Sequence, residues 1–217
     1  QAALTVLTQG ELARQEMELG AQAAQQQEST RAALRSAVGS LKTLEADVAA
    51  ELVARHRQAT AAEKTTAGQL STGELTSLES NVRYQLARAY RNQGLCYEAM
   101  SADRINALSQ SIEVLKKLEQ GPLDDGLFWS VRLDQAACLR MLGDATAAAE
   151  KLAAIEAQQP APAIAARVRA ERIRGFLEAA KIDAALAVVA EPHASDAWAD
   201  GDLAELEAVV AAWQRAA

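Results

Sequence analysis

The chain has 217 residues, of which 50% are hydrophobic and only 4% aromatic, and its formal net charge is −7. This length is enough for one large domain or two small ones with a sizeable core. The acidic balance argues against a general nucleic-acid binder, which is usually basic. Ala, Leu, Glu, Gln and Arg are abundant while β-branched and aromatic residues are sparse, and this composition predicts a chain that is nearly all helix.

The segment 1–70 predicts long, irregular helices that pack on the rest of the chain. Residues 4–27 carry a loose apolar stripe, and Gln25-Gln26-Gln27 is polar enough to end a helix. Glu28-Ser29-Thr30 then offers an N-cap for a second helix. The apolar residues of this second helix recur at intervals of three and four, which places them on one face and predicts a helix that continues to about Ala62.

A clear break precedes the next helix. Ser71, with Glu74 three residues later, has the sequence of a capping box. The helix that it starts should stop at Gly94, because glycine suits a helix C-terminus. Ser101-Ala102-Asp103 then either caps the partner helix or interrupts the chain before it. The apolar stripe expected on that partner helix consists of Ile105, Leu108, Ile112, Leu115 and Leu118.

Two further helix pairs follow a turn at Asp124-Asp125-Gly126. The first pair spans 128–142 and 144–159, with a glycine between the helices and an aspartate as the cap of the second. A weaker copy comes next, and in it Ala180 stands where the glycine would be. A final amphipathic helix from about Asp202, with glutamates on its outer side, suits a terminal cap.

The helix pairs share a pattern of small, bulky, glycine and alanine positions. The residues that carry it are Leu86, Ala87, Tyr90, Gly94 and Ala99, then Trp129, Ala136, Leu139, Gly143, Ala148, Leu152 and Pro160. With this pattern the chain resembles the tetratricopeptide repeat (TPR) family. The resemblance implies an all-α fold, an α-solenoid of stacked antiparallel helix pairs wound into a right-handed superhelix. The repeats would occupy 71–190, after the N-terminal helices of 1–70 and before a capping helix in 191–217, in one continuous domain.

The same pattern predicts which side chains lie between helices. We expect burial of Leu86, Ala87, Tyr90, Ala136, Leu139, Ala148, Leu152 and Ile155.

No pattern in the sequence points to an enzyme, a cofactor or a metal site. The nucleotide-binding glycine loops and the nucleophile elbow are missing, and His56 and His193 have no cysteine or zinc-protease spacing around them. Cys96 and Cys138 are expected to be small buried side chains. No apolar run is long enough to span a membrane. Because the sequence begins at Gln1, we expect a processed or shortened form, and localisation stays open.

Arginine recurs on the faces that would line the concave groove of such a repeat. The candidate peptide-binding residues are Tyr84, Arg88, Arg91, Asn92, Arg140, Arg167 and Arg174. Guanidinium groups bind carboxylates bidentately, so an acidic or C-terminal peptide segment is the ligand expected from this face. Solvated arginines would add little to folding. The alternative is that these arginines pair with glutamates of neighbouring helices.

Three functions follow from these observations. The first is a non-catalytic protein–protein interaction module with a protein or peptide partner and no nucleic acid. The second is a structural or assembly segment of a larger repeat protein, with no ligand of its own. The third, an enzyme or small-ligand domain, is disfavoured by the missing motifs and by the few histidines and aromatics.

Overall fold

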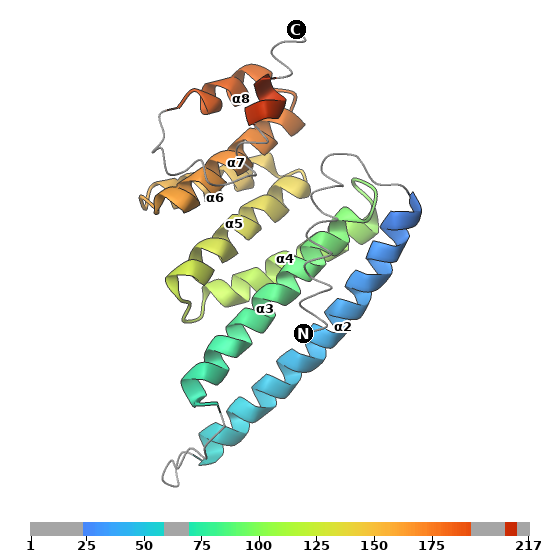
Figure 1. Ribbon diagram of the computed structural model, residues 1–217, viewed down its shortest axis with the longest axis vertical. Coiled ribbons are helices and arrows are strands. Elements are labelled where there is room, and N and C mark those ends of the chain that lie inside the picture. The colour runs from blue at the N-terminus through green and yellow to red at the C-terminus, as the bar shows by residue number, and fades with distance from the viewer. Residues whose placement is uncertain (1–23, 59–69, 192–206, 212–217) are drawn as a thin grey trace. The chain divides into compact units, whose positions relative to one another are not determined.

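The computed structural model describes residues 24–58, 70–191 and 207–211. Within these ranges all regular secondary structure is helical and no strand is present, which confirms the all-α prediction. The helices in Figure 1 are α2 (Ala24–Gln58), α3 (Thr72–Leu95), α4 (Ala102–Glu119), α5 (Asp125–Met141), α6 (Ala145–Glu156), α7 (Pro162–Glu178) and α8 (Ile182–Val189). The helix expected before Gln25 and most of the one expected after Asp202 lie outside the described residues.

Contacts divide the chain into two compact units, 1–131 and 132–217, with the boundary inside α5. In the first unit α3 packs against both α2 and α4, and in the second α7 packs against both α6 and α8. The helices thus pack in adjacent pairs. The boundaries expected from sequence near residues 70 and 190 stay a prediction.

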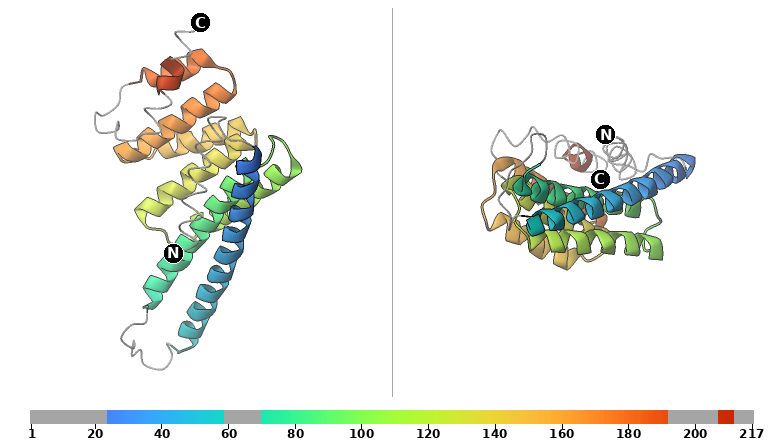
Figure 2. Two further views of the ribbon diagram at one scale, coloured as in Figure 1. Left: turned by 45° about the vertical axis from the view of Figure 1, so that its right-hand side comes forward. Right: turned by 90° about the horizontal axis from the view of Figure 1, so that it is seen from below.

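The helix α2 is longer at its N-terminal end than the sequence pattern predicts. Gln25, Gln26 and Gln27 lie inside it, so the helix end predicted there, and the N-cap predicted at residues 28–30, are wrong. Glutamine is a good helix former, and its polarity alone does not end a helix. Figure 2 shows α2 running antiparallel to α3 along its length. Its buried face consists of Leu34, Ala37, Val38, Leu41, Val48 and Leu52.

The start of α3 confirms the predicted capping box. Ser71 Oγ accepts a hydrogen bond from the Glu74 amide at 3.2 Å, and Glu74 Oε2 accepts one from the Ser71 amide at 2.8 Å. The helix α3 ends at Leu95, one residue after the predicted Gly94, so Gly94 lies inside the last turn and is not the residue that follows the helix. A Cβ atom at Gly94 would lie 3.0 Å from Leu108 Cγ, so this glycine permits a close approach of α3 and α4 instead of ending the helix.

The helix α4 begins at the predicted cap, since Ser101 Oγ accepts from the Arg104 amide at 3.3 Å. Its predicted stripe is buried except at Ile105, which is 41% exposed. The Ser111 hydroxyl donates to the Ala87 carbonyl at 2.8 Å and so joins α4 to α3 within the core. This polar contact between two helices is not visible in an apolar pattern.

The helix α5 begins three residues before the predicted position. Asp124 Oδ1 accepts from the Leu127 amide at 2.7 Å, and Asp125 and Gly126 already belong to the first helical turn. The turn predicted at residues 124–126 is therefore the N-terminus of α5, with Asp124 at the capping position.

The α5–α6 connection in the second unit has the predicted glycine. Gly143 has φ +85°, and the Asp144 amide donates to the Leu139 carbonyl at 3.0 Å, which closes the end of α5. Asp144 Oδ1 then accepts from the Ala147 amide at 3.0 Å and caps α6 as predicted.

The α7–α8 connection repeats this geometry without a glycine. Ala180 has φ +55°, and the Lys181 amide donates to the Phe176 carbonyl at 2.8 Å. Ala180 thus takes the left-handed conformation of Gly143 at the position where the sequence pattern places the missing glycine.

The predicted packing positions are buried with one exception. Leu86, Ala87, Tyr90, Ala136, Ala148, Leu152 and Ile155 are buried, and Leu139 is half-buried. Cys96 and Cys138 are buried as predicted, and burial raises the pKa of the Cys96 thiol to about 11. This thiol is therefore protonated at neutral pH.

Candidate functional site

The seven residues predicted to line a concave groove divide between the two units. Tyr84, Arg88, Arg91 and Asn92 lie on α3, in the first unit. Arg140 on α5 and the arginines at 167 and 174 on α7 lie in the second unit.

The α3 group contains two residues whose side chains are buried and hydrogen-bonded to each other. Arg91 is 6% and Asn92 is 1% exposed, and two guanidinium nitrogens of Arg91 donate to Asn92 Oδ1 at 3.3 Å. The expectation of solvated side chains is wrong for this pair. Arg88 and Tyr84 are half-buried, with the Arg88 guanidinium 6.0 Å from the centre of the Tyr84 ring.

The second-unit group is organised by the half-buried carboxylate of Glu171. Arg140 Nε lies 3.0 Å from Glu171 Oε2, and Arg174 Nη1 lies 2.7 Å from Glu171 Oε1. Arg140 also pairs with Glu178. Burial alone would raise the pKa of the Glu171 carboxyl, but the charges and hydrogen bonds of the two arginines outweigh it and lower the pKa to about 2.

The charges of Arg140 and Arg174 are therefore matched by glutamate within their own unit, as the alternative interpretation of the arginine pattern expects. Arg140 is 8% exposed, so it belongs to the folded core. Arg167 is half-buried. Among the seven predicted residues, Tyr84, Arg88, Arg167 and Arg174 are half-buried.

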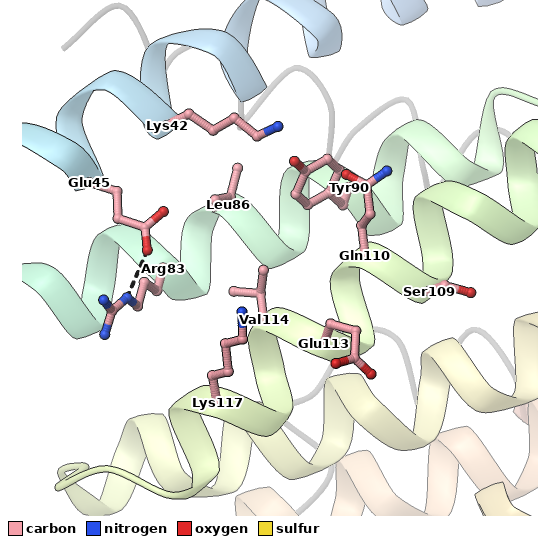
Figure 3. A pocket seen from close by; sticks show the side chains of 10 residues that line it. All are labelled: Lys42, Glu45, Arg83, Leu86, Tyr90, Ser109, Gln110, Glu113, Val114 and Lys117. Atoms are coloured by element: carbon pink, nitrogen blue, oxygen red, sulfur yellow. Dashed lines mark hydrogen bonds and ion pairs between the residues drawn. The ribbon is translucent and has the colours of Figure 1, made fainter.

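A groove that the repeat pattern does not predict lies on the first unit, where α2 and α4 flank α3. Its volume is about 380 Å³. Figure 3 shows the side chains that line it, which are Lys42, Glu45, Arg83, Leu86, Tyr90, Ser109, Gln110, Glu113, Val114 and Lys117.

The groove and the predicted arginines occupy opposite faces of α3. Successive residues of an α-helix are separated by about 100°. Leu86 and Tyr90 therefore share one face of α3, while Tyr84 and Arg88 share the face on the far side of the helix. The groove is a separate surface from the one that the repeat pattern indicates.

The floor of the groove is apolar and belongs to the core of the first unit. Leu86 and Tyr90 of α3 are 3% and 6% exposed and pack with Val38 and Leu41 of α2. Val114 of α4 is half-buried and packs against the same cluster. Since side chains of three helices hold these residues, the floor is preformed.

The walls carry charges of both signs. Arg83 pairs with Glu45 at 2.8 Å and with Glu79 at 2.7 Å, and Glu113 pairs with Lys116 at 3.3 Å. Lys42 extends over the floor from α2, with its ammonium 5.5 Å from the centre of the Tyr90 ring.

Lys117 completes the groove from the opposite wall. It extends from α4 towards the floor, as Figure 3 shows. Across the described residues, no carboxylate lies within ion-pair distance of Lys42 or Lys117.

The groove could have been suspected from one feature of the sequence. Val114 and Lys117 lie beside the main stripe of α4, and Val114 is an apolar residue with no place in that stripe. An apolar residue next to, but outside, a helix stripe indicates a second contact surface. The partner surface on α2, however, depends on a pairing of helices that the sequence does not show.

Comparison of the chain with protein-family models, curated proteins and solved structures finds no match. In the described ranges, no helix is long and apolar enough to cross a membrane. Over the same ranges, no three side chains of His, Cys, Asp or Glu gather as metal ligands would.

Proposed function

We propose that the chain is a non-catalytic protein–protein interaction module, a TPR-like α-solenoid of stacked helix pairs that binds a peptide segment of a partner. The groove between α2, α3 and α4 is the binding surface on the first unit. The observation that carries this proposal is the preformed apolar floor of Leu86, Tyr90 and Val114, open to solvent between two charged walls.

The repeat interpretation is supported by the two connections in the second unit. Gly143 and Ala180 follow a first helix, take the same left-handed conformation and precede a second helix. A helix pair buries its apolar faces only by stacking on a neighbouring pair, which is the packing principle of helical repeat proteins.

The groove has the composition of a peptide-binding surface. Its volume of about 380 Å³ lies at the lower end of the range for pockets that hold ligands, so it suits one or two side chains of a peptide. Interfaces place apolar anchors at the centre and polar groups at the rim. The floor and walls of the groove have this arrangement.

A second candidate is an assembly segment of a larger repeat protein that binds no ligand. The ion pairs of Glu171 with Arg140 and Arg174 favour it, because they neutralise arginines that a ligand was expected to use. Under this alternative, the groove would be covered only by the chain's own neighbours in the assembly.

A displayed library of random peptides tests the proposal. Ser109 is exposed at the groove, so Ser109→Trp should cover the floor without disturbing the core. Ala102→Trp adds the same side chain to an exposed position of α4 that does not line the groove. Selected peptides should bind the parent and the Ala102 variant but lose binding to the Ser109 variant. Peptides that bind all three chains equally, or a library that yields no binder, contradict the proposal.

A further inference from the structure

We propose that the groove between α2, α3 and α4 recognises a short peptide segment in which a large apolar residue is flanked by acidic residues. This inference rests on the proposed function and adds the chemistry of the partner. It places acidic recognition on the groove face of α3, not on the arginine face that the repeat pattern indicates.

The apolar part of the ligand follows from the floor. Leu86, Tyr90 and Val114 present a continuous apolar surface whose side chains are held by the core cluster of the first unit. A polar ligand side chain placed over Leu86 and Val114 would lose its hydration without gaining a hydrogen bond from them. An aliphatic or aromatic side chain is the anchor that fits.

The acidic part follows from the charges of the walls. The two carboxylates of the lining are already engaged, Glu45 with Arg83 and Glu113 with Lys116. Lys42 and Lys117 remain on opposite sides of the floor without a carboxylate within ion-pair distance among the described residues. Carboxylates on both sides of the anchor would complement the two ammonium groups.

A nucleic acid fits the same walls less well. The lining contains carboxylates at Glu45 and Glu113, and Arg83 is held between two glutamates. A phosphate backbone would meet these negative charges along its path, while a short peptide places its acidic residues only at the two lysines. The chain as a whole is also acidic, with a net charge of −7.

Fluorescence anisotropy with a defined probe tests the inference. The probe is a fluorescein-labelled peptide in which a leucine and a phenylalanine are flanked on each side by glutamates. The variant Lys42→Gln/Lys117→Gln should weaken binding at least about tenfold at low salt, because two charge contacts are lost. The variant Arg35→Gln/Lys181→Gln loses the same charge at exposed positions outside the groove and should bind within about twofold of the parent.

Two further probes make each outcome decisive. A peptide with glutamine in place of every glutamate should bind more weakly than the acidic probe, and a single-stranded oligonucleotide should not displace the acidic probe. Equal binding by the parent and the Lys42/Lys117 variant overturns the inference, as does equal binding of both peptides. Displacement by the oligonucleotide would assign the lysines to phosphate recognition instead.

The result also separates this inference from the function on which it rests. If library peptides bind in a manner that Ser109→Trp abolishes, yet the acidic probe does not bind, the module binds peptides and the acidic chemistry is wrong. If neither the library nor the probe yields a binder, the proposed function itself fails.

Discussion

Replacing Ala180 by glycine should stabilise the second unit. Ala180 has φ +55° in the connection between α7 and α8, a conformation that costs an L-residue about 1 to 2 kcal/mol. Glycine removes this cost but gives the unfolded chain additional freedom worth about 0.4 to 1 kcal/mol. Ala180 is exposed, so loss of its methyl group removes little buried surface. The free energy of unfolding should rise by about 0.5 to 1 kcal/mol.

Two matched variants should lower the free energy of unfolding, opposite to the effect of Ala180→Gly. Ala179→Gly makes the same chemical change one residue earlier, where φ is −83°, so only the unfolded-state term remains and stability should fall by about 0.5 to 1 kcal/mol. Gly143→Ala introduces a methyl group at φ +85° with no atom within 4 Å of it, so the cost is conformational and should be about 1 kcal/mol.

Thermal denaturation followed by far-ultraviolet circular dichroism measures all three variants. For a chain of this length, 1 kcal/mol corresponds to a shift in Tm of about 2 to 4 °C. Ala180→Gly should raise Tm, and the other two variants should lower it. A fall in Tm for Ala180→Gly would mean that Ala180 does not take the left-handed conformation in the folded chain.

Three other predictions concern helix contacts. Gly94→Ala should lower the free energy of unfolding measured in urea by about 1 kcal/mol or more. Overpacking against the fully buried Leu108 should outweigh the gain in helix propensity of about 1 kcal/mol. A stabilised variant contradicts the close approach of α3 and α4 at Gly94. Because the pKa of Glu171 is lower in the folded chain, its ionisation adds about 3 kcal/mol to the free energy of unfolding. This contribution is present above pH 4.5 and is lost as the pH falls towards 2. Glu171→Gln should therefore destabilise strongly in urea titrations at pH 7 and little at pH 2, and equal effects would count against the ion pairs. Arg169→Ala should lower Tm and reduce the free energy of unfolding by about 2 to 4 kcal/mol. The reason is that the Arg169 guanidinium donates to three carbonyls at the end of α8 at 2.6 to 2.8 Å. A reduction below about 1 kcal/mol would show that water replaces the guanidinium.

Local sequence signals predicted much of the fold. Ser71 with Glu74, Ser101 and Asp144 were identified as helix starts because a cap is formed by residues within one turn of each other. The position of Ala180 was identified because it stands at a fixed distance from its neighbours in a repeated pattern. These signals need no knowledge of which helices meet.

The failures depend on contacts between helices. Gly94 is a residue type that commonly follows a helix end. In the structure, its missing side chain lets Leu108 of the neighbouring helix pack closely against α3. Arginine is a residue type usually found on the surface. Arg140 is buried because its charge is paired with Glu171, which lies beside it in the fold. A sequence pattern gives the face on which a residue lies and not the charge that faces it.

The candidate groove was missed for the same reason. Leu86 and Tyr90 were correctly predicted to be buried, but Lys42, from a helix that begins far earlier in the chain, forms the opposite wall. Only the pairing of α2 with α3 brings Lys42 and Tyr90 together. A pattern along one helix does not predict a site whose residues come from several helices.

The proposed ligand-binding surface is the groove on the first unit. Hydrogen–deuterium exchange of the intact chain, with and without the tightest peptide from the library selection, tests it most directly. If the groove binds the peptide, exchange should slow on the groove-lining turns of α2, α3 and α4, around Lys42, Tyr90 and Val114. Protection confined to α5 through α8, or protection on the turn of Arg88 without any on α2 and α4, would contradict it.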